Sequence, residues 1–325
     1  MANQLYLAIH GGNVESTAAA VDQNGRIHAI CTGTSLNFYQ TGKHFQQHLH
    51  NLLSSLAMLL QMSFGDIVQK ASKLCIGTAG LITDTDKIEL ANILKGFGFT
   101  AEQYIICEDC DIVLPAGILS NTGICIIAST GALVLVVESN GRRFAIDGYG
   151  PLLGDHGSGY SIGRTILRTI MRKYDEKDDQ VKVLTRYVLD YLDLDSPLSL
   201  LNWFHTLMKT QNEQKIVSDL AIPLNLAVLK HNDAISRSIF EKGVRRLFQS
   251  VELAMKKLAA DSAEDAGSLP VVLYGKLLEN SSYFRDRFLS MLSTYFQADQ
   301  IKMAQYRPIV GAILFALAGK TCMPA

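Results

Sequence analysis

The sequence Gly154-Asp155-His156-Gly157-Ser158-Gly159-Tyr160-Ser161-Ile162-Gly163 joins a glycine-rich turn to the start of a helix. Apolar residues follow at helical spacing, namely Ile162, Ile166, Leu167, Ile170 and Met171. A turn of this kind exposes backbone N–H groups and presents the positive end of a helix dipole, which suits a phosphate or a polar sugar. Other glycine turns precede and follow it along the chain, so we interpret the stretch together with them.

The composition of the chain is that of a globular protein. It has 325 residues, of which 48% are hydrophobic and 19% charged, and this length predicts about two domains. The formal net charge of −1 argues against nucleic acid as the main partner. No apolar run approaches about 18 residues, so we expect no membrane association through a spanning helix. The first residues carry no leader pattern, and we expect a cytoplasmic protein.

The first third of the chain reads as strands followed by helices. Asn24-Gly25 is a strong signal for a hairpin between two strands. Strands that alternate with helices after an antiparallel hairpin predict an α/β domain with a mixed sheet. The pattern predicts strands over residues 5–10, 16–21, 26–31, 74–77 and 104–107, and helices over residues 45–60 and 87–94.

The same order begins again roughly 118 residues further along the chain. A strand, a glycine turn, a strand, an Asn140-Gly141 turn and a third strand follow one another, as they do near the N-terminus. We interpret this as an internal duplication of architecture. The predicted strands cover residues 123–128, 132–138 and 143–146, a helical region covers about 155–262, and a strand at 269–274 and a helix at 309–317 follow.

Eight short motifs stand in a characteristic order. They are residues 10–16, 34–37, 79–81, 108–110, 129–132, 147–150, 154–158 and 274–276. Together they resemble the BadF/BadG/BcrA/BcrD ATPase family and its N-acetylglucosamine kinases, within the actin, hexokinase and Hsp70 superfold, over nearly the whole chain.

The resemblance implies an α/β fold of two RNase H-like halves, the actin-like ATPase fold, with a central cleft. Residues 1–118 form the expected N-terminal domain, completed by a C-terminal helix at 308–325. Residues 119–307 form the expected C-terminal domain, enlarged by a helical insertion.

The resemblance also implies an ATP-dependent sugar kinase that uses ATP and Mg²⁺ and phosphorylates N-acetylglucosamine, glucosamine or a relative. The expected catalytic base is Asp109, because it follows a strand end where cleft residues of α/β sheets lie. A carboxylate there can accept the proton of a sugar hydroxyl. Taken by itself, Asp109 is more readily explained as a helix N-cap, and the motif order reverses that preference. The sequence does not fix the sugar, the hydroxyl or the metal ligands, and a homodimer is common in the family.

The remaining candidate residues carry ligand-binding roles by the same resemblance. Each of them, taken singly, is also explained as a turn, a cap or a packing residue. The expected sugar-binding residues are Asn37, Gly148, Tyr149 and Asp155, and the expected ATP-binding residues are Gly11, Gly12, Ser16, Thr130, Gly131 and Gly275.

The first phosphate loop departs from the family pattern. His10 stands in place of an acidic residue, Asn13 in place of a third glycine, Val14 in place of threonine and Glu15 in place of a basic residue. This favours, as an alternative, a non-catalytic sugar- or nucleotide-binding protein on the same fold. A third interpretation is an ATPase activator that holds an iron–sulfur cluster through cysteines. We disfavour it, because the nearest candidates, Cys107 and Cys110, lie beside the proposed base Asp109 and do not form a separate pair.

Overall fold

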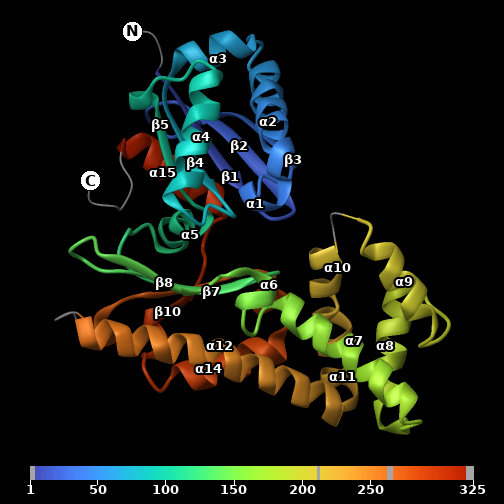
Figure 1. Ribbon diagram of the computed structural model, residues 1–325. Helices are drawn as coiled ribbons and strands as arrows, with labels where there is room; N and C mark the ends of the chain where they lie inside the picture. The colour runs from blue at the N-terminus through green and yellow to red at the C-terminus, as the bar shows by residue number, and fades with distance from the viewer. Residues whose placement is uncertain (1–3, 211–212, 262–265, 320–325) are drawn as a thin grey trace. The chain divides into compact units, whose positions relative to one another are not determined.

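The chain divides into two compact units in the computed structural model (Figure 1). The structure describes residues 4–210, 213–261 and 266–319. The first three residues, on which the expectation about a leader partly rests, lie outside the described residues. The first unit comprises Met1–Gly123, Val137–Arg143 and Lys302–Ala325. The second comprises Ile124–Val136 and Phe144–Ile301.

A five-stranded mixed sheet forms the centre of the first unit. Strands β1 and β2 and strands β2 and β3 pair antiparallel, whereas β4 and β5 run parallel to β1. The predicted turn at Asn24-Gly25 is confirmed, and Gly25 adopts a φ of +78°. The sheet order is β3 (Ile27–Thr34), β2 (Glu15–Val21), β1 (Leu5–Gly11), β4 (Ala71–Thr78) and β5 (Tyr104–Glu108).

Helices cover both faces of this sheet. Along β1, Leu7 and Ile9 enter one hydrophobic cluster and Ala8 enters another, because successive strand residues face opposite ways. The first cluster contains residues of α2 (Phe45–Leu59), α3 (Phe64–Lys70) and α4 (Asp84–Gly96). The second contains residues of α5 (Asp109–Ile118) and α15 (Pro308–Ala318).

The second unit repeats this architecture around another five-stranded sheet. Its strands β6, β7 and β8 take the places of β1, β2 and β3, while β9 and β10 take those of β4 and β5. The predicted duplication is therefore confirmed at the level of strand order. The sheet order is β10 (Ile301–Met303), β9 (Val271–Tyr274), β6 (Gly123–Ala128), β7 (Ala132–Val137) and β8 (Arg143–Asp147).

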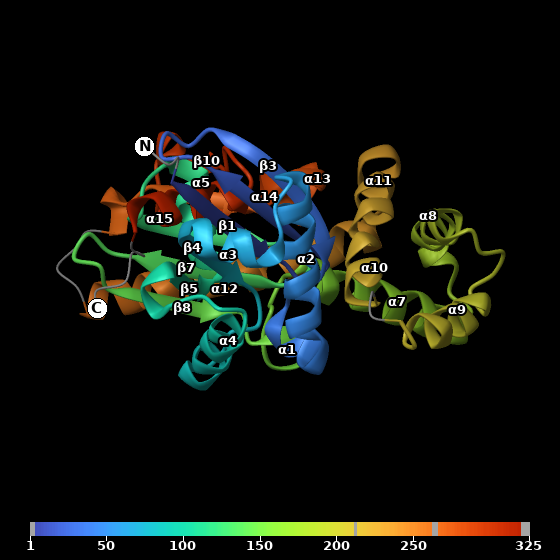
Figure 2. The ribbon, with the colours of Figure 1, turned by 90° about the horizontal axis from the view of Figure 1, so that it is seen from above.

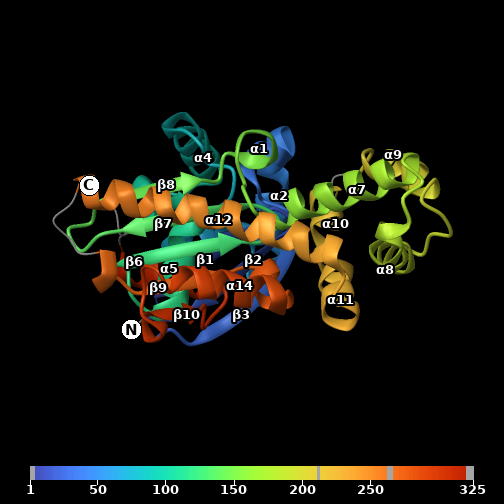
Figure 3. The same cartoon turned by 90° about the horizontal axis from the view of Figure 1, so that it is seen from below.

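Most of the remaining chain of this unit is helical, as predicted. The longest helix is α12 (Ala234–Asp261), which lies across the second sheet beside α14 (Ser282–Leu292) (Figure 3). Figure 2 shows a further group of helices gathered at one end of the unit. They are α7 (Gly159–Asp175), α8 (Lys182–Leu192), α9 (Ser199–Leu207), α10 (Glu213–Asp219) and α11 (Ala221–His231), and the short helices α6 (Gly150–Leu153) and α13 (Lys276–Asn280) complete the unit.

Within the described residues, no single helix has the length and apolar character needed to cross a membrane. The segments Phe38–Leu59 and Phe64–Lys70 pass that test only when taken as a pair, and they meet at a bend of 86°.

Candidate active site

Asp109 is the first residue of α5, directly after the end of β5. The N-cap of α5 is Glu108, whose backbone N–H donates to the carboxylate of Asp111 at 3.0 Å. The alternative interpretation of Asp109 as an N-cap is therefore wrong. Strand β5 is parallel to β4, which is parallel to β1, and Glu108 is in register with Thr78 and Gly11. Asp109 follows Glu108 and therefore lies at the carboxyl edge of the first sheet.

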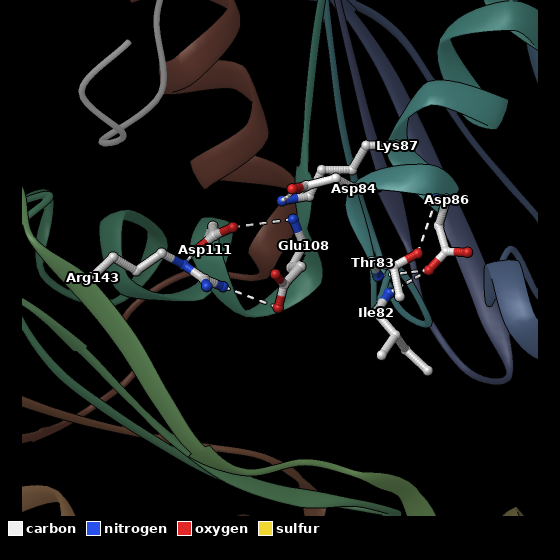
Figure 4. Close-up of polar contacts among 8 residues, drawn as sticks. All are labelled: Ile82, Thr83, Asp84, Asp86, Lys87, Glu108, Asp111 and Arg143. Atoms are coloured by element: carbon white, nitrogen blue, oxygen red, sulfur yellow. Dashed lines mark hydrogen bonds and ion pairs between the residues drawn. The ribbon is translucent and has the colours of Figure 1, made fainter.

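An arginine holds the carboxylates on either side of Asp109. The guanidinium of Arg143 donates to Asp111 Oδ1 at 2.6 Å and lies 3.0 Å from Glu108 Oε2 (Figure 4). It also reaches the sulfur of Cys110 at 3.4 Å. The bridge fixes the first turn of α5, and with it the backbone that carries Asp109. Sequence reasoning missed Arg143, because nothing local links a residue of the second hairpin to this helix.

The surroundings of Asp109 favour its protonated form. Burial, with the neighbouring carboxylates Glu108 and Asp111, raises the pKa of Asp109 to about 7. Burial also raises the pKa of Asp111, against the effect of Arg143. Among the residues that the structure describes, Asp109 forms no ion pair. A carboxylate with a pKa near neutrality is suited to accept and release a proton.

The first glycine turn closes the hairpin between β1 and β2. The Gly12 N–H donates to the Glu15 carbonyl at 3.1 Å, and the Gly11 carbonyl accepts from the Ala79 N–H at 2.8 Å. Gly11 is required by close approach, since an added Cβ would collide with the side chain of Thr78. The imidazole of His10 lies beside Gly12, and burial lowers the pKa of His10 to about 4. His10 is therefore neutral at pH 7.

Two residues near this turn are engaged in structural hydrogen bonds. The Ser16 hydroxyl, 1% exposed, donates to the Thr34 carbonyl at 2.7 Å, so the structure does not bring Ser16 to the surface of the turn. Asn37 is the N-cap of α1 (Phe38–Thr41), and its Oδ1 accepts from the Gln40 N–H at 2.8 Å. Its Nδ2 donates to Asn13 Oδ1 at 2.7 Å, which joins a predicted sugar-binding residue to the first turn.

The second glycine turn is held by the start of α7. The Ser129 N–H donates to the Gly131 carbonyl at 2.8 Å, closing the turn between β6 and β7. The Gly159 N–H donates to the Ser129 carbonyl at 2.8 Å, and the Tyr160 N–H donates to the Thr130 carbonyl at 3.3 Å. The glycine-rich stretch and the second turn, predicted separately, are thus one structure.

Asp155 lies against this second turn. Its Oδ1 accepts from the Ala132 N–H at 3.2 Å, and its carboxylate packs beside Gly131. Burial, together with the nearby Asp147, raises the pKa of Asp155 to about 6. The structure therefore groups Asp155, a predicted sugar-binding residue, with the predicted phosphate-binding residues.

Asp147 organises the loop that carries the other sugar-binding candidates, and sequence reasoning did not select it. Its Oδ1 accepts from the N–H groups of Gly148 at 3.0 Å and Asp155 at 2.6 Å. Its Oδ2 accepts from the His156 N–H at 2.9 Å and from the Ser250 hydroxyl at 3.2 Å. Its side chain is buried, and the only signal in the sequence was its place before Gly148 in a family motif.

The last two candidates differ in their surroundings. Tyr149 is 66% exposed, so its ring is accessible to a ligand. Gly275 sits between β9 and α13 at a φ of +119°, and an added Cβ would collide with the Ala128 carbonyl at the end of β6. Gly275 therefore borders the second turn.

Sequence comparison identifies relatives along nearly the whole chain. Residues 9–316 match the BadF/BadG/BcrA/BcrD ATPase family. An N-acetyl-D-glucosamine kinase of Dictyostelium discoideum is 27% identical over 98% of this chain and 100% of its own length. An N-acetylmuramic acid/N-acetylglucosamine kinase of Clostridium acetobutylicum is 26% identical over 83% of this chain and 85% of its own length.

Solved structures share the fold. A candidate N-acetylglucosamine kinase from Chromobacterium violaceum superimposes with a TM-score of 0.71 at 16% identity, covering 97% of this chain and 99% of that one. A ROK family glucokinase from Streptomyces griseus, solved with glucose and AMPPNP, gives 0.52 at 13% identity, covering 97% and 98%. The two α/β units described above therefore form the actin-like fold of these kinases.

Proposed function

The chain belongs to the BadF/BadG/BcrA/BcrD ATPase family, and we propose that it is an ATP-dependent sugar kinase acting on N-acetylglucosamine or a related amino sugar. Relatives that match most of the chain carry the names of sugar kinases, which supports the reaction class and ATP as the donor. The amino sugar rests on the names of those relatives alone.

The observation that carries the proposal is the state of Asp109. Its carboxylate stands at the carboxyl edge of the first sheet with its pKa raised to about 7. As the acceptor hydroxyl oxygen attacks the γ-phosphorus of ATP and the bond to ADP breaks, Asp109 takes the hydroxyl proton. Arg143 keeps the first turn of α5 in place while the charge on Asp109 changes.

The glycine turns supply the expected contacts to the nucleotide. Backbone N–H groups at Thr130 and Gly131 are the proposed phosphate donors, because such turns form concave anion sites. Gly11 and Gly12 would let the chain approach the phosphates closely, since the Gly12 N–H already donates to the Glu15 carbonyl. Gly275 borders the adenosine in the proposal, and Asn37, Gly148 and Tyr149 hold the sugar. We leave Ser16 out of the set, since its hydroxyl is buried in the hairpin.

Mg²⁺ is the metal that the reaction class brings. Within the described ranges no group of three or more His, Cys, Asp or Glu residues could hold a metal ion. Mg²⁺ at nucleotide sites takes one or two carboxylates, keeps water and binds phosphate oxygens, so one carboxylate fits. Asp155, beside the second turn, is that carboxylate. When bound, Mg²⁺ supplies neutralisation of phosphate charge.

A second candidate function follows from the first turn. Its neutral His10 and exposed Glu15 stand in place of an acidic and a basic residue, and Asn13 is bonded to Asn37. These features favour a protein that binds a sugar or nucleotide without turnover. The cluster-binding interpretation loses support, because Cys107 and Cys110 are 0% and 1% exposed and burial raises the pKa of the Cys110 thiol.

A coupled ADP-release assay tests the proposal. Mg-ATP is offered with N-acetylglucosamine, glucosamine, N-acetylmuramic acid and glucose, using wild type, Asp109→Asn and the matched surface variant Glu89→Gln. Sugar-dependent turnover that survives in Glu89→Gln and disappears in Asp109→Asn supports the kinase and names its substrate. Saturable sugar binding by calorimetry without turnover would instead favour the binding protein.

The expectations of a cytoplasmic location and a homodimer stay predictions. Light scattering coupled to size-exclusion chromatography measures the oligomeric state directly.

A further inference from the structure

A cavity of about 320 Å³ opens among α7, α9 and α10 of the second unit, in the helical group seen in Figure 2. This volume lies in the range of small-molecule sites. None of the candidate active-site residues lines the cavity. Tyr160 lines the cavity and directly follows Gly159, the first residue of α7, which contacts the second glycine turn.

The wall of the cavity is mostly apolar. Leu200 and Val217 are 2% exposed and form its buried part, while Leu167 and Phe204 are half-buried beside them. Leu201 is 43% exposed at the cavity, so apolar surface also reaches solvent there. Apolar surface of this kind favours an aliphatic or aromatic body in the occupant.

Two cations interrupt this apolar lining. Arg164 and Arg168 both line the cavity, and their spacing on α7 places them on one face of the helix. Neither has a hydrogen-bond or ion-pair partner among the residues that the structure describes. By contrast Arg172, one turn further along, donates to Glu176 at 2.8 Å. Two like charges at this spacing repel each other, and an anion between them relieves that repulsion.

We propose that this cavity binds an organic anion with an apolar body. The acidic group is a carboxylate, sulfonate or phosphate monoester held by Arg164 and Arg168, because the planar guanidinium matches such oxyanions through paired N–H donors. The aliphatic or aromatic body lies on Leu167, Leu200 and Phe204. A neutral apolar molecule would bury the apolar lining but leave both arginine charges without a partner. A bare inorganic anion would pair with the arginines but leave the apolar lining exposed to water.

Fluorescence titration with 1-anilinonaphthalene-8-sulfonate tests the proposal on the whole protein. The expected result is one saturable site in the folded protein, competed by octanoate and not by octanol. The double variant Arg164→Gln/Arg168→Gln should weaken binding about tenfold or more, since two charge-assisted contacts are lost. Arg172→Gln on the same helix is the matched control and should bind as wild type does.

A second variant tests the cavity without changing its charge. Leu201→Trp fills the opening from an exposed position, so the fold should be kept, as circular dichroism checks, while dye binding falls. Equal binding by the double variant and wild type, or equal competition by octanol and octanoate, would overturn the proposal. Competition by ATP or N-acetylglucosamine would also overturn it, by assigning the dye to the proposed active site. None of these readouts needs turnover, so they stand apart from a failure of the kinase assay.

Discussion

Replacing Asp109 with asparagine should stabilise the folded protein at alkaline pH while it abolishes turnover. The pKa of Asp109 is raised from 3.8 to about 7 in the folded state, so ionisation above pH 7 costs folding free energy. At about 1.36 kcal/mol per pKa unit, the cost slightly exceeds 4 kcal/mol. Because Asp109 is only partly buried, solvent reduces it, and we expect about 2 kcal/mol.

The sign of the pH dependence follows from the raised pKa. Between about pH 4 and pH 7 the folded state holds a proton that the unfolded state has released. The free energy of unfolding of wild type therefore falls as the pH rises from 4, and the loss is complete once the pH has passed 7. Asp109→Asn removes the titration. Its free energy of unfolding should therefore match that of wild type near pH 4 and exceed it at pH 8.5.

Urea denaturation followed by circular dichroism at pH 4, 7 and 8.5 measures the difference. The matched control is Asp111→Asn, which weakens the 2.6 Å contact to Arg143 and should destabilise the protein by roughly 3 kcal/mol at pH 7. An Asp109→Asn protein that is no more stable than wild type at pH 8.5 would refute the reasoning. The carboxylate would then be well solvated and its pKa ordinary.

Three further substitutions probe the neighbours of this site. Glu108→Gln removes a charge that raises the pKa of Asp109. The acid limb of the kcat/KM profile should therefore move down by about one pH unit, which gives about fivefold more deprotonated Asp109 at pH 6. An acid limb that does not move would argue against Asp109 as the base. Asp147→Asn keeps the loop conformation but loses acceptors for the His156 N–H and the Ser250 hydroxyl. Thermal unfolding should show a loss of about 2 kcal/mol in stability, and the KM for the sugar should rise more than the KM for ATP. A larger rise in the KM for ATP would contradict the assigned role. His10→Asp restores the acidic residue beside Gly12. It should lower the Mg²⁺ concentration that gives half-maximal turnover several-fold. An unchanged Mg²⁺ titration would place His10 outside the phosphate site.

The strand pattern was the part of the fold most readily predicted from the sequence. Asn24-Gly25 and Asn140-Gly141 marked the two hairpins, because few dipeptides adopt the required turn. The strand β10 was not predicted, since three residues of mixed polarity, Ile301–Met303, leave no periodicity to detect.

The site was predicted in pieces, and tertiary contacts supplied the rest. Asp109 was selected because a family motif follows a strand end that is visible in the sequence, and its role as the base stays a prediction. The role of Arg143 was not, because its carboxylate partners lie more than thirty residues earlier and only folding brings them together. The engagement of Ser16 with Thr34 also depends on strand pairing, which motif order does not encode.

The position of α15 has a consequence for biosynthesis. This helix covers the face of the first sheet that carries Ala8 and Cys75, yet residues 308–318 are made after every segment of the second unit. Until they leave the ribosome, α5 covers that face of the first unit without α15. The second unit, whose segments all lie earlier, has its whole sequence available sooner. The half of the protein that is translated first therefore completes its core last.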